Sequence, residues 1–193
     1  FNYENINQFI DQFNDLRVLV VGETIIDKYI FCEAVGKSGK DPMLVLRKID
    51  NKSYLGGAAV VANHISSFTN KTQIISINGN NKIENDFINK SLNKNIKKKF
   101  FSKKNSPTIV KTRFVDKNSN HKILGVYDVD NDSISKPQTN EIIKYLKSII
   151  HKFDIVLVFD YGHGFLNKKI STFLSKNSKV LALNAQINSM SLG

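Results

Sequence analysis

The chain has 193 residues, of which 41% are hydrophobic and 10% aromatic, so it can bury the core of one ordinary domain and is not a disordered chain. Its formal net charge is +11 at pH 7. No apolar run reaches the roughly 18–20 residues that a membrane span requires, and the first residues lack the basic-then-apolar pattern of a signal peptide. We therefore expect no membrane partner.

The positive charge is carried almost entirely by lysine, which is abundant along the whole chain. Arg17, Arg47 and Arg113 are the only arginines, and aromatic residues are not interleaved with them as single-strand binding would require. The densest lysine cluster, at positions 94, 97–99 and 103–104, is expected to be a solvated loop and edge-strand rim. We therefore expect no nucleic-acid partner, and a basic nucleic-acid-binding protein is the third interpretation that we consider.

The single cysteine, Cys32, cannot form an internal disulfide and has no second thiolate with which to hold a metal. A reducing, cytoplasmic setting fits this usage. The histidines at positions 64, 121, 151 and 163 are spaced far from one another and from Cys32, so no metal site is expected. The chain does not begin with Met, which fits a segment of a longer protein.

In chain order, apolar residues at helical spacing predict a helix over residues 5–15, and the apolar run at 17–22 predicts a strand buried on both faces of a parallel sheet. Mixed alternation over about 28–35 and 43–49 suits a small exposed sheet that stands off the main body. We then expect a helix from Gly56-Gly57 to about residue 68, a strand over 72–77, a short helix near 84–93 and a strand over 96–101.

The second half follows the same pattern. Period-two alternation over 106–115 and 121–130 predicts a hairpin. Ser135 and Gln138, with Pro137 between them, fit a capping box that opens a helix. A buried strand at 155–159, a helix capped by Asn167 and one more buried strand at 180–183 follow. Strands that alternate with amphipathic helices indicate an α/β fold with a doubly wound parallel sheet, and the segments at about 28–49 and 107–129 are expected to form a lid.

Two carboxylates and a pair of glycines are predicted at one edge of this sheet. Asp27 and Asp160 follow the ends of two strands, and Gly56 and Gly57 begin a helix near the edge where open α/β sheets bind ligands. Glycines let backbone N–H groups approach a ligand, and carboxylates accept paired hydrogen bonds from sugar hydroxyls. The pattern favours a polyhydroxylated ligand. The alternative is that the acids are ordinary turn residues and the glycines a tight turn before a core helix.

Lys111 and Arg113 share one face of their strand because side chains alternate with period two. If this face points at the cleft, they can hold a phosphate; otherwise they form a solvated face. His163 lies between two glycines and is interpreted as a turn residue, with contact to an anion as the alternative. The sequence contains no G-x-S-x-G elbow, no Walker A loop and no G-x-G-x-x-G fingerprint, which argues against those chemistries.

Four motifs in this order resemble the PfkB/ribokinase family of carbohydrate kinases. They are VVGETIIDKY at 20–29, LGGAA at 55–59, PTIVKTR at 107–113 and DYGHG at 160–164. The similarity is greatest to the branch that contains heptose-phosphate kinases and kinase-like domains fused to a nucleotidyltransferase. It covers the chain from Leu16 onward but only the N-terminal portion of the family's fold.

The resemblance implies a ribokinase-like three-layer α/β domain with a β lid that closes on the sugar and often mediates a homodimer. It implies phosphoryl transfer from MgATP to a hydroxyl of a sugar or sugar phosphate. Asp27 matches the family's sugar-binding carboxylate, Gly56 and Gly57 match its di-glycine, and Asp160 matches the acid after the later strand. With Lys111 and Arg113, these are the substrate-binding residues that we expect.

Two departures from the family pattern bear on function. Val60 stands where many relatives carry an Asn that binds the sugar, which leaves the substrate open. The G-A-G-D segment, which supplies the anion hole and the catalytic Asp, does not occur among the 193 residues, and the C-terminal ATP-binding part is missing with it. We therefore expect no catalytic residue and no kinase activity in this chain alone, with MgATP bound only by the full-length parent. The alternative function is a degenerate, non-catalytic interaction module.

Overall fold

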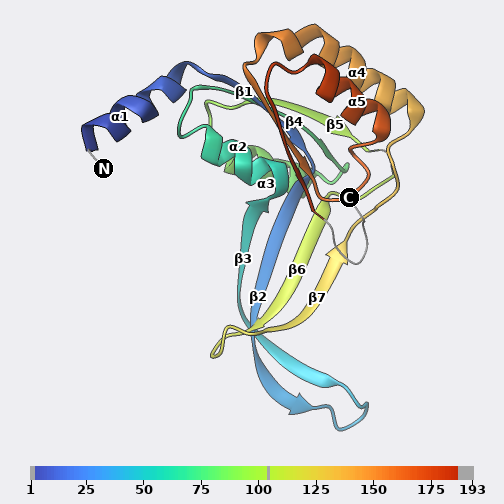
Figure 1. The fold of residues 1–193 in the computed structure, drawn as a ribbon. Helices are drawn as coiled ribbons and strands as arrows, with labels where there is room; N and C mark the ends of the chain where they lie inside the picture. The colour runs from blue at the N-terminus through green and yellow to red at the C-terminus, as the bar shows by residue number, and fades with distance from the viewer. Residues whose placement is uncertain (1–2, 104, 187–193) are drawn as a thin grey trace.

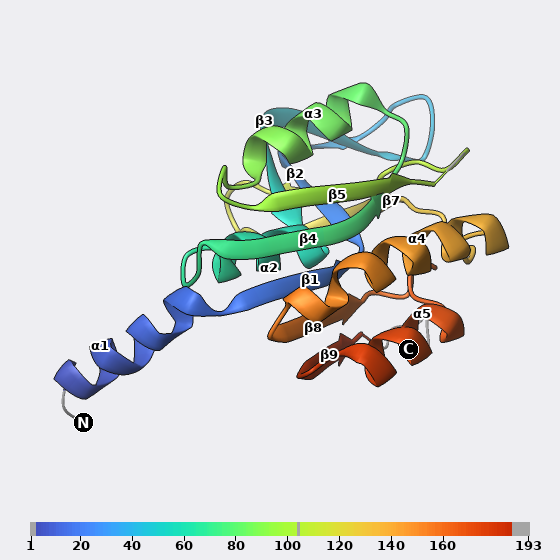
Figure 2. The ribbon, with the colours of Figure 1, turned by 90° about the horizontal axis from the view of Figure 1, so that it is seen from above.

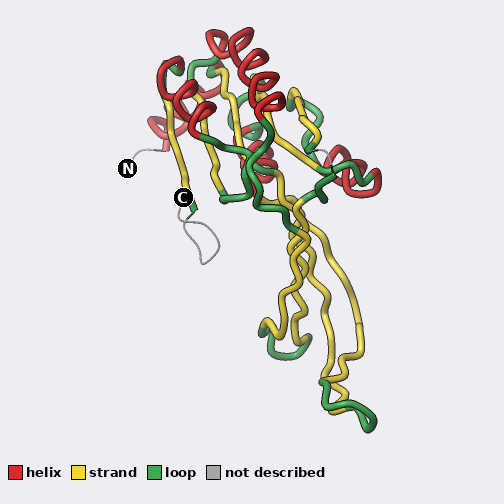
Figure 3. The backbone as a smooth tube through the Cα atoms, turned by 90° about the vertical axis from the view of Figure 1, so that its right-hand side faces the viewer, coloured by secondary structure: helices red, strands yellow, loops and turns green. Residues whose placement is uncertain are grey.

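A computed structural model describes residues 3–103 and 105–186. These residues form a five-stranded sheet flanked by helices, which we call the body, and a four-stranded sheet, which we call the lid. The lid strands reach well away from the body (Figures 1 and 3). The α/β fold with a parallel sheet and a small β lid that the sequence predicts is therefore confirmed.

The body sheet is entirely parallel. Its strands lie side by side in the order β5-β4-β1-β8-β9 (Figure 2). Their bounds are β1 Arg17–Gly22, β4 Lys71–Asn78, β5 Lys97–Ser102, β8 Ile155–Asp160 and β9 Leu181–Ala185. The strand that opens the chain's apolar pattern, β1, is thus the central strand.

The central strand β1 is buried on both faces, as its continuous apolar run predicts. Leu19 and Val21 belong to the core under α4 and α5, whereas Val18 and Val20 belong to the core under α2 and α3. The two cores therefore lie on opposite faces of one sheet, which gives the body three layers (Figure 1).

The helices begin where the sequence places their caps. Ser135 and Gln138 form the predicted capping box at the start of α4, Lys136–Ile149, and Asn167 accepts two backbone N–H groups at the start of α5, Lys168–Asn177. The other two body helices are α2, Gly57–Ile65, and α3, Lys82–Ser91. No helix in the described part of the chain is long and apolar enough to cross a membrane.

The lid has the strand order β3-β2-β6-β7. β2 and β3 form one antiparallel hairpin, β6 and β7 form the predicted second one, and β2 runs parallel to β6. The bounds are β2 Thr24–Lys37, β3 Leu44–Gly56, β6 Ile109–Asp116 and β7 Lys122–Asp128. The first hairpin is longer than the segment 28–49 that the sequence predicts, and it begins closer to the body. β2 starts two residues after β1 ends, and β3 ends where α2 begins.

Three local expectations need correction. The helix expected over 5–15 is an α-helix only at α1, Tyr3–Asp11, and continues as the 3-10 turn η1, Gln12–Asp15. The strand expected to be buried at 180–183 is exposed along its whole length, because β9 is the edge of the sheet and Leu183 is 63% exposed. The predicted rim of lysines does lie along the edge strand β5. The side chain of Lys103, predicted to be solvated, is only 12% exposed. Lys104 lies outside the described residues. A second 3-10 turn, η2, spans Ile150–Lys152.

Candidate functional site

One face of the lid is lined by polar, cationic and aromatic side chains, and we call it the polar face. Register defines it, since residues paired across strands project on the same side of a sheet. Asp27 is paired with Tyr54 and Lys111, and Lys111 is paired with Tyr127. Two residues further along the strands, Tyr29 is paired with Arg113. The members are Asp27, Tyr29, Tyr54, Lys111, Arg113 and Tyr127.

Asp27 and Arg113 form an ion pair at the centre of the polar face. The Arg113 guanidinium donates a 2.5 Å hydrogen bond to Oδ1 of Asp27, and the two side chains are 19% and 26% exposed. The guanidinium also lies 5.6 Å from the ring centroids of both Tyr29 and Tyr127. Burial opposes the charged form of Arg113, but the bond to Asp27 and the charge of Asp27 leave its pKa raised overall. The guanidinium of Arg113 is thus charged and is positioned on the polar face by its bond to Asp27.

Lys111 lies beside this pair as a second cation. Its Nζ is 6.0 Å from the centroid of the Tyr127 ring. Burial lowers the pKa of Lys111, the Asp27 carboxylate counteracts this, and the neighbouring Arg113 adds to the lowering. A half-buried amine next to a guanidinium gains from an anionic ligand, since a phosphate would offset both desolvation and repulsion.

The two glycines are required by the close approach of the chain to Asp27 and Glu23. A side chain at Gly56 would place its Cβ 2.4 Å from Oδ2 of Asp27. Gly57 has φ +59°, and a Cβ there would lie 2.2 Å from the carbonyl oxygen of Glu23. The di-glycine therefore brings the N-terminus of α2 against the Asp27 carboxylate, as its predicted role requires.

Glu23 is a site residue whose role the sequence reasoning missed. Its side chain is fully buried and accepts hydrogen bonds from the backbone N–H groups of Tyr161 at 3.0 Å and of His163 and Phe165 at 3.3 Å. Burial raises the pKa of Glu23, the bond from Tyr161 lowers it, and the nearby Asp160 raises it further. A carboxylate directly after a buried strand was the available signal.

Asp160 ends β8 and turns the chain into the loop that Glu23 holds. Its Oδ1 accepts the backbone N–H of Gly162 at 2.9 Å, so it has the turn role that the sequence left as an alternative. Its charge also acts on Glu23. Asp27, Gly56, Gly57, Lys111 and Arg113 thus contact one another directly or through strand pairing, and Asp160 joins them through Glu23.

His163 is a buried turn residue. Its Nδ1 lies within hydrogen-bond distance of Oδ1 of Asn131, at 2.7 Å. Burial lowers the pKa of His163 to about 4, and the charges of Lys111 and Lys103 act in the same direction. The position of His163 in the loop held by Glu23 agrees with its interpretation as a turn residue.

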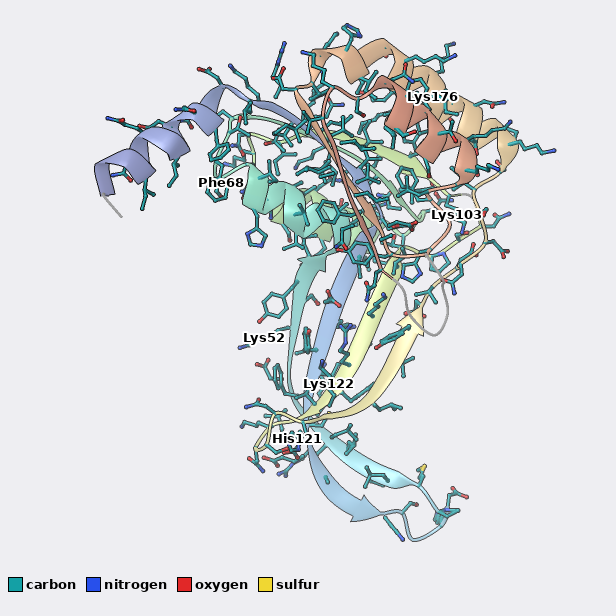
Figure 4. The ribbon with its side chains drawn as sticks, viewed as in Figure 1. Lys52, Phe68, Lys103, His121, Lys122 and Lys176 are labelled. Carbon is teal, nitrogen blue, oxygen red and sulfur yellow. The ribbon has the colours of Figure 1, made fainter. Side chains whose placement is uncertain are left out.

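A polar cluster joins the segment after β5 to the segment after β7. Lys103 donates to the carbonyl oxygens of Asp130 and Asp132 at 3.0 and 2.6 Å and pairs with the Asp130 carboxylate at 3.0 Å. The hydroxyl of Ser106 donates to the same carboxylate, and chiefly for this reason the pKa of Asp130 falls to about 2. The other labelled lysines lie on the lid and on α5, so positive charge is spread widely (Figure 4).

The fold is similar to that of one class of protein of known structure, the ribokinase-like sugar kinases. Phosphofructokinase-2 from Escherichia coli, solved in complex with fructose-6-phosphate, superimposes with a TM-score of 0.65 and 13% identity, over 91% of this chain and 56% of that chain. Ribokinase from Thermotoga maritima gives a TM-score of 0.55 and 18% identity, over 87% of this chain and 52% of that chain. At these identities the likeness establishes the fold.

Sequence relatives point to one branch of that class. The bifunctional protein HldE of Desulfatibacillum aliphaticivorans is 29% identical over 180 residues, which are 91% of this chain and 36% of that protein. HldE of Aliarcobacter butzleri is 30% identical over 173 residues, 85% of this chain and 35% of that protein. The chain thus spans about a third of the length of these curated relatives. No model of a protein family matches the chain. The resemblance to carbohydrate kinases of the heptose-phosphate branch is confirmed.

Proposed function

We propose that this chain is the substrate-binding portion of a carbohydrate kinase and holds a sugar or sugar phosphate on the polar face of the lid. The observation that carries the proposal is the meeting of the Asp27 carboxylate, the N-terminus of α2 and the cations Lys111 and Arg113 at the junction of lid and body. The relatives supply the class of reaction, in which a phosphoryl group is transferred to a sugar.

The site offers two kinds of contact that a phosphorylated sugar needs. Oδ1 of Asp27 accepts from Arg113, while Oδ2 faces Gly56 at the start of α2, and a carboxylate can accept hydrogen bonds from ligand hydroxyls. Lys111 and Arg113 can pair with the phosphate, which suits the fork of a guanidinium. Gly56 and Gly57 allow the ligand to approach the backbone of α2, and Asp160 supports the loop on the other side of Asp27.

The kinase reaction of the full-length parent is proposed to use MgATP. Among residues 3–103 and 105–186, no group of three or more His, Cys, Asp and Glu side chains could hold a metal ion. We derive no step through MgATP. We propose that the 193 residues transfer no phosphoryl group by themselves, because no G-A-G-D segment occurs among them.

A thermal-shift panel tests the proposed function. The ligands are sedoheptulose 7-phosphate, fructose 6-phosphate, the two free sugars and MgATP, each at physiological salt. A ligand present at a hundred times its dissociation constant stabilises the native state by roughly 2.7 kcal/mol. A shift with a sugar phosphate and none with MgATP supports the proposal. No shift with any sugar favours the degenerate interaction module, and a shift with MgATP alone contradicts our placement of the site.

We also propose a homodimer formed through the lid. The face opposite the polar face carries Ile30, Phe114, Leu124 and Val126, of which Leu124 and Val126 are 54% and 49% exposed. A row of exposed apolar side chains on a protruding sheet is a typical interaction surface. Sedimentation of the wild type should give a dimer, and Leu124→Glu with Val126→Glu should give a monomer. A monomeric wild type at micromolar concentration would refute the dimer.

A further inference from the structure

Glu23 contacts two of the segments that border the candidate site, the loop after β8 and the first turn of α2. Its carboxylate holds the loop after β8 through three backbone N–H groups, and its carbonyl oxygen accepts the N–H of Ala58 in the first turn of α2 at 2.8 Å. Along the chain it is the single residue between the body strand β1 and the lid strand β2, four positions before Asp27. We propose that Glu23 is the positioning residue that fixes Asp27, the α2 N-terminus and the loop after Asp160 relative to one another.

The carboxylate chemistry at this position is specific. Oε2 accepts from Tyr161, while Oε1 accepts from both His163 and Phe165. A glutamine could keep the two bonds at one oxygen, but its amide group would then present N–H to the N–H of Tyr161. Two donors cannot satisfy each other, so the loop must move or leave a buried N–H without an acceptor. An isosteric substitution therefore tests the carboxylate and not the packing.

A buried carboxylate is a costly choice for a purely structural role. Removing a charge from water is expensive, and apolar residues of similar size often stabilise a fold as well or better. Glu23 has no cation within ion-pair distance among the described residues, and Asp160 adds repulsion. What the carboxylate provides is three acceptor contacts to a loop that has no regular secondary structure. Precise placement of that loop is the gain, which suits a binding site more than a core.

The titratable groups that act on Glu23 lie on β8, on β6 and in the loop. Burial raises the pKa of Glu23 and Asp160 at the end of β8 raises it further, while the charge of Lys111 on β6 interacts with that of Glu23. Burial also raises the pKa of Tyr161 in the loop, and the charge of Glu23 adds to this. Glu23 is therefore electrostatically linked to both Lys111 and the loop. Protonation of Glu23 should loosen the loop and weaken the site together.

The first experiment reads out the loop without any ligand. In the full chain, hydrogen exchange of the backbone N–H groups at residues 161, 163 and 165 is compared between wild type, Glu23→Gln and the matched control Glu33→Gln, which removes a partly exposed carboxylate from the following strand, β2. We expect roughly tenfold faster exchange in Glu23→Gln at residue 161, whose N–H loses its acceptor, with exchange in α4 and α5 unchanged. Equal exchange in both variants would overturn the inference.

A second measurement needs no variant and covers the case in which Glu23→Gln does not fold. In the wild-type protein, the amide proton shifts of residues 161 and 163 should titrate together with the Glu23 carboxyl carbon, at a pH above the range of an ordinary glutamate. The N–H of Gly162, which bonds Asp160, serves as the internal reference. Amide shifts that follow Asp160 and not Glu23 would contradict the proposed contacts.

The binding readout alone rests on the proposed function. Affinity for fructose 6-phosphate and sedoheptulose 7-phosphate is measured by calorimetry for the same proteins. We expect roughly a tenfold loss in Glu23→Gln and none in Glu33→Gln. If wild type binds neither sugar phosphate, the proposed function fails while the exchange result stands. If wild type binds and Glu23→Gln binds equally well, the positioning role fails and the proposed function stands.

Discussion

The body and the lid are built from the same kind of strand but are stabilised in different ways. In the body, β1 and β4 are buried almost throughout, and helices cover both faces of the sheet. In the lid, β7 is exposed along its whole length, and β3 is buried only at its last two residues, where it meets α2. The body is therefore stabilised by apolar burial, and the lid chiefly by strand pairing and by the ionic and aromatic contacts of its polar face.

This difference explains where the candidate site lies. A rigid body cannot close over a ligand, and an exposed sheet cannot fix a geometry by itself. At their junction, Asp27 and Arg113 come from the lid, while Gly57 and Glu23 belong to the packed body edge. Substitutions in the body should therefore change stability, and substitutions on the polar face should change binding.

The largest expected effect is the loss of a buried body side chain. Leu146 on α4 is fully buried, so Leu146→Ala should lower the free energy of unfolding by about 2–5 kcal/mol. Leu124→Ala in the exposed part of the lid should change it by no more than about 0.5 kcal/mol. Urea unfolding of the two variants measures both. A comparable loss of unfolding free energy in both variants would contradict our conclusion that body and lid are stabilised in different ways.

The next effect is a pH dependence of the free energy of unfolding, caused by His163 in the loop after β8. Burial lowers the pKa of His163 to about 4, so the folded state favours the neutral ring. The stability that this provides is fully present above the unfolded pKa of about 6.5 and is lost as the pH falls toward 4, by about 3 kcal/mol at most. Unfolding of the wild type should show this loss between pH 6.5 and 4, and His163→Gln should lack it. His121→Gln, in an exposed lid loop, is the matched control and should retain the wild-type dependence.

The third effect compares the cost of replacing a glycine in the body with the cost of replacing one in the lid. Gly57→Ala should cost about 1–3 kcal/mol, because an alanine at φ +59° is strained and its Cβ would meet the carbonyl oxygen of Glu23. Gly39→Ala, at the lid tip, has no atom within 4 Å of the new Cβ and should be close to neutral. Thermal unfolding of both variants measures the difference. A neutral Gly57→Ala would mean that the contact between α2 and Glu23 is loose.

The smallest effect distinguishes two ion pairs within the lid. Arg47 pairs with Glu33 near the lid tip, where its side chain is 68% exposed, so Arg47→Ala should change stability by at most about 0.5 kcal/mol. Arg113→Ala removes the partner of the partly buried Asp27 and should cost about 1 kcal/mol. Its effect on sugar-phosphate affinity should be much larger than its effect on stability. Equal effects of the two substitutions would argue against a special environment for Arg113.

Local rules were sufficient for much of the fold. The run at 17–22, the capping box of Ser135 with Gln138 and the cap Asn167 each depend on neighbours a few residues away, and each prediction is confirmed. The strand at 180–183 was expected to be buried because it is apolar. Its exposure depends on its position at the edge of the sheet, which no local pattern contains.

The candidate site was only partly predictable for the same reason. Gly56 and Gly57 stand at the helix start that the sequence predicts, whereas Asp27, predicted to follow the end of a body strand, lies within the lid strand β2. The pairing of Asp27 with Arg113 joins residues 86 positions apart, and it arises from the parallel register of β2 and β6. Glu23 directly follows a buried strand, but its role was not predicted because its partners are backbone N–H groups more than 130 positions away, which no local pattern indicates.

The most direct test of the central claim is the affinity for sugar phosphate measured with and without the Asp27 carboxylate. Calorimetry compares sedoheptulose 7-phosphate and fructose 6-phosphate with their free sugars for wild type, Asp27→Asn and the control Asp50→Asn on the neighbouring lid strand. We predict that wild type and Asp50→Asn bind a phosphorylated sugar more tightly than its free form, and that Asp27→Asn loses roughly tenfold or more in affinity. Sugar-phosphate binding that Asp27→Asn leaves unchanged would contradict the polar face as the substrate site.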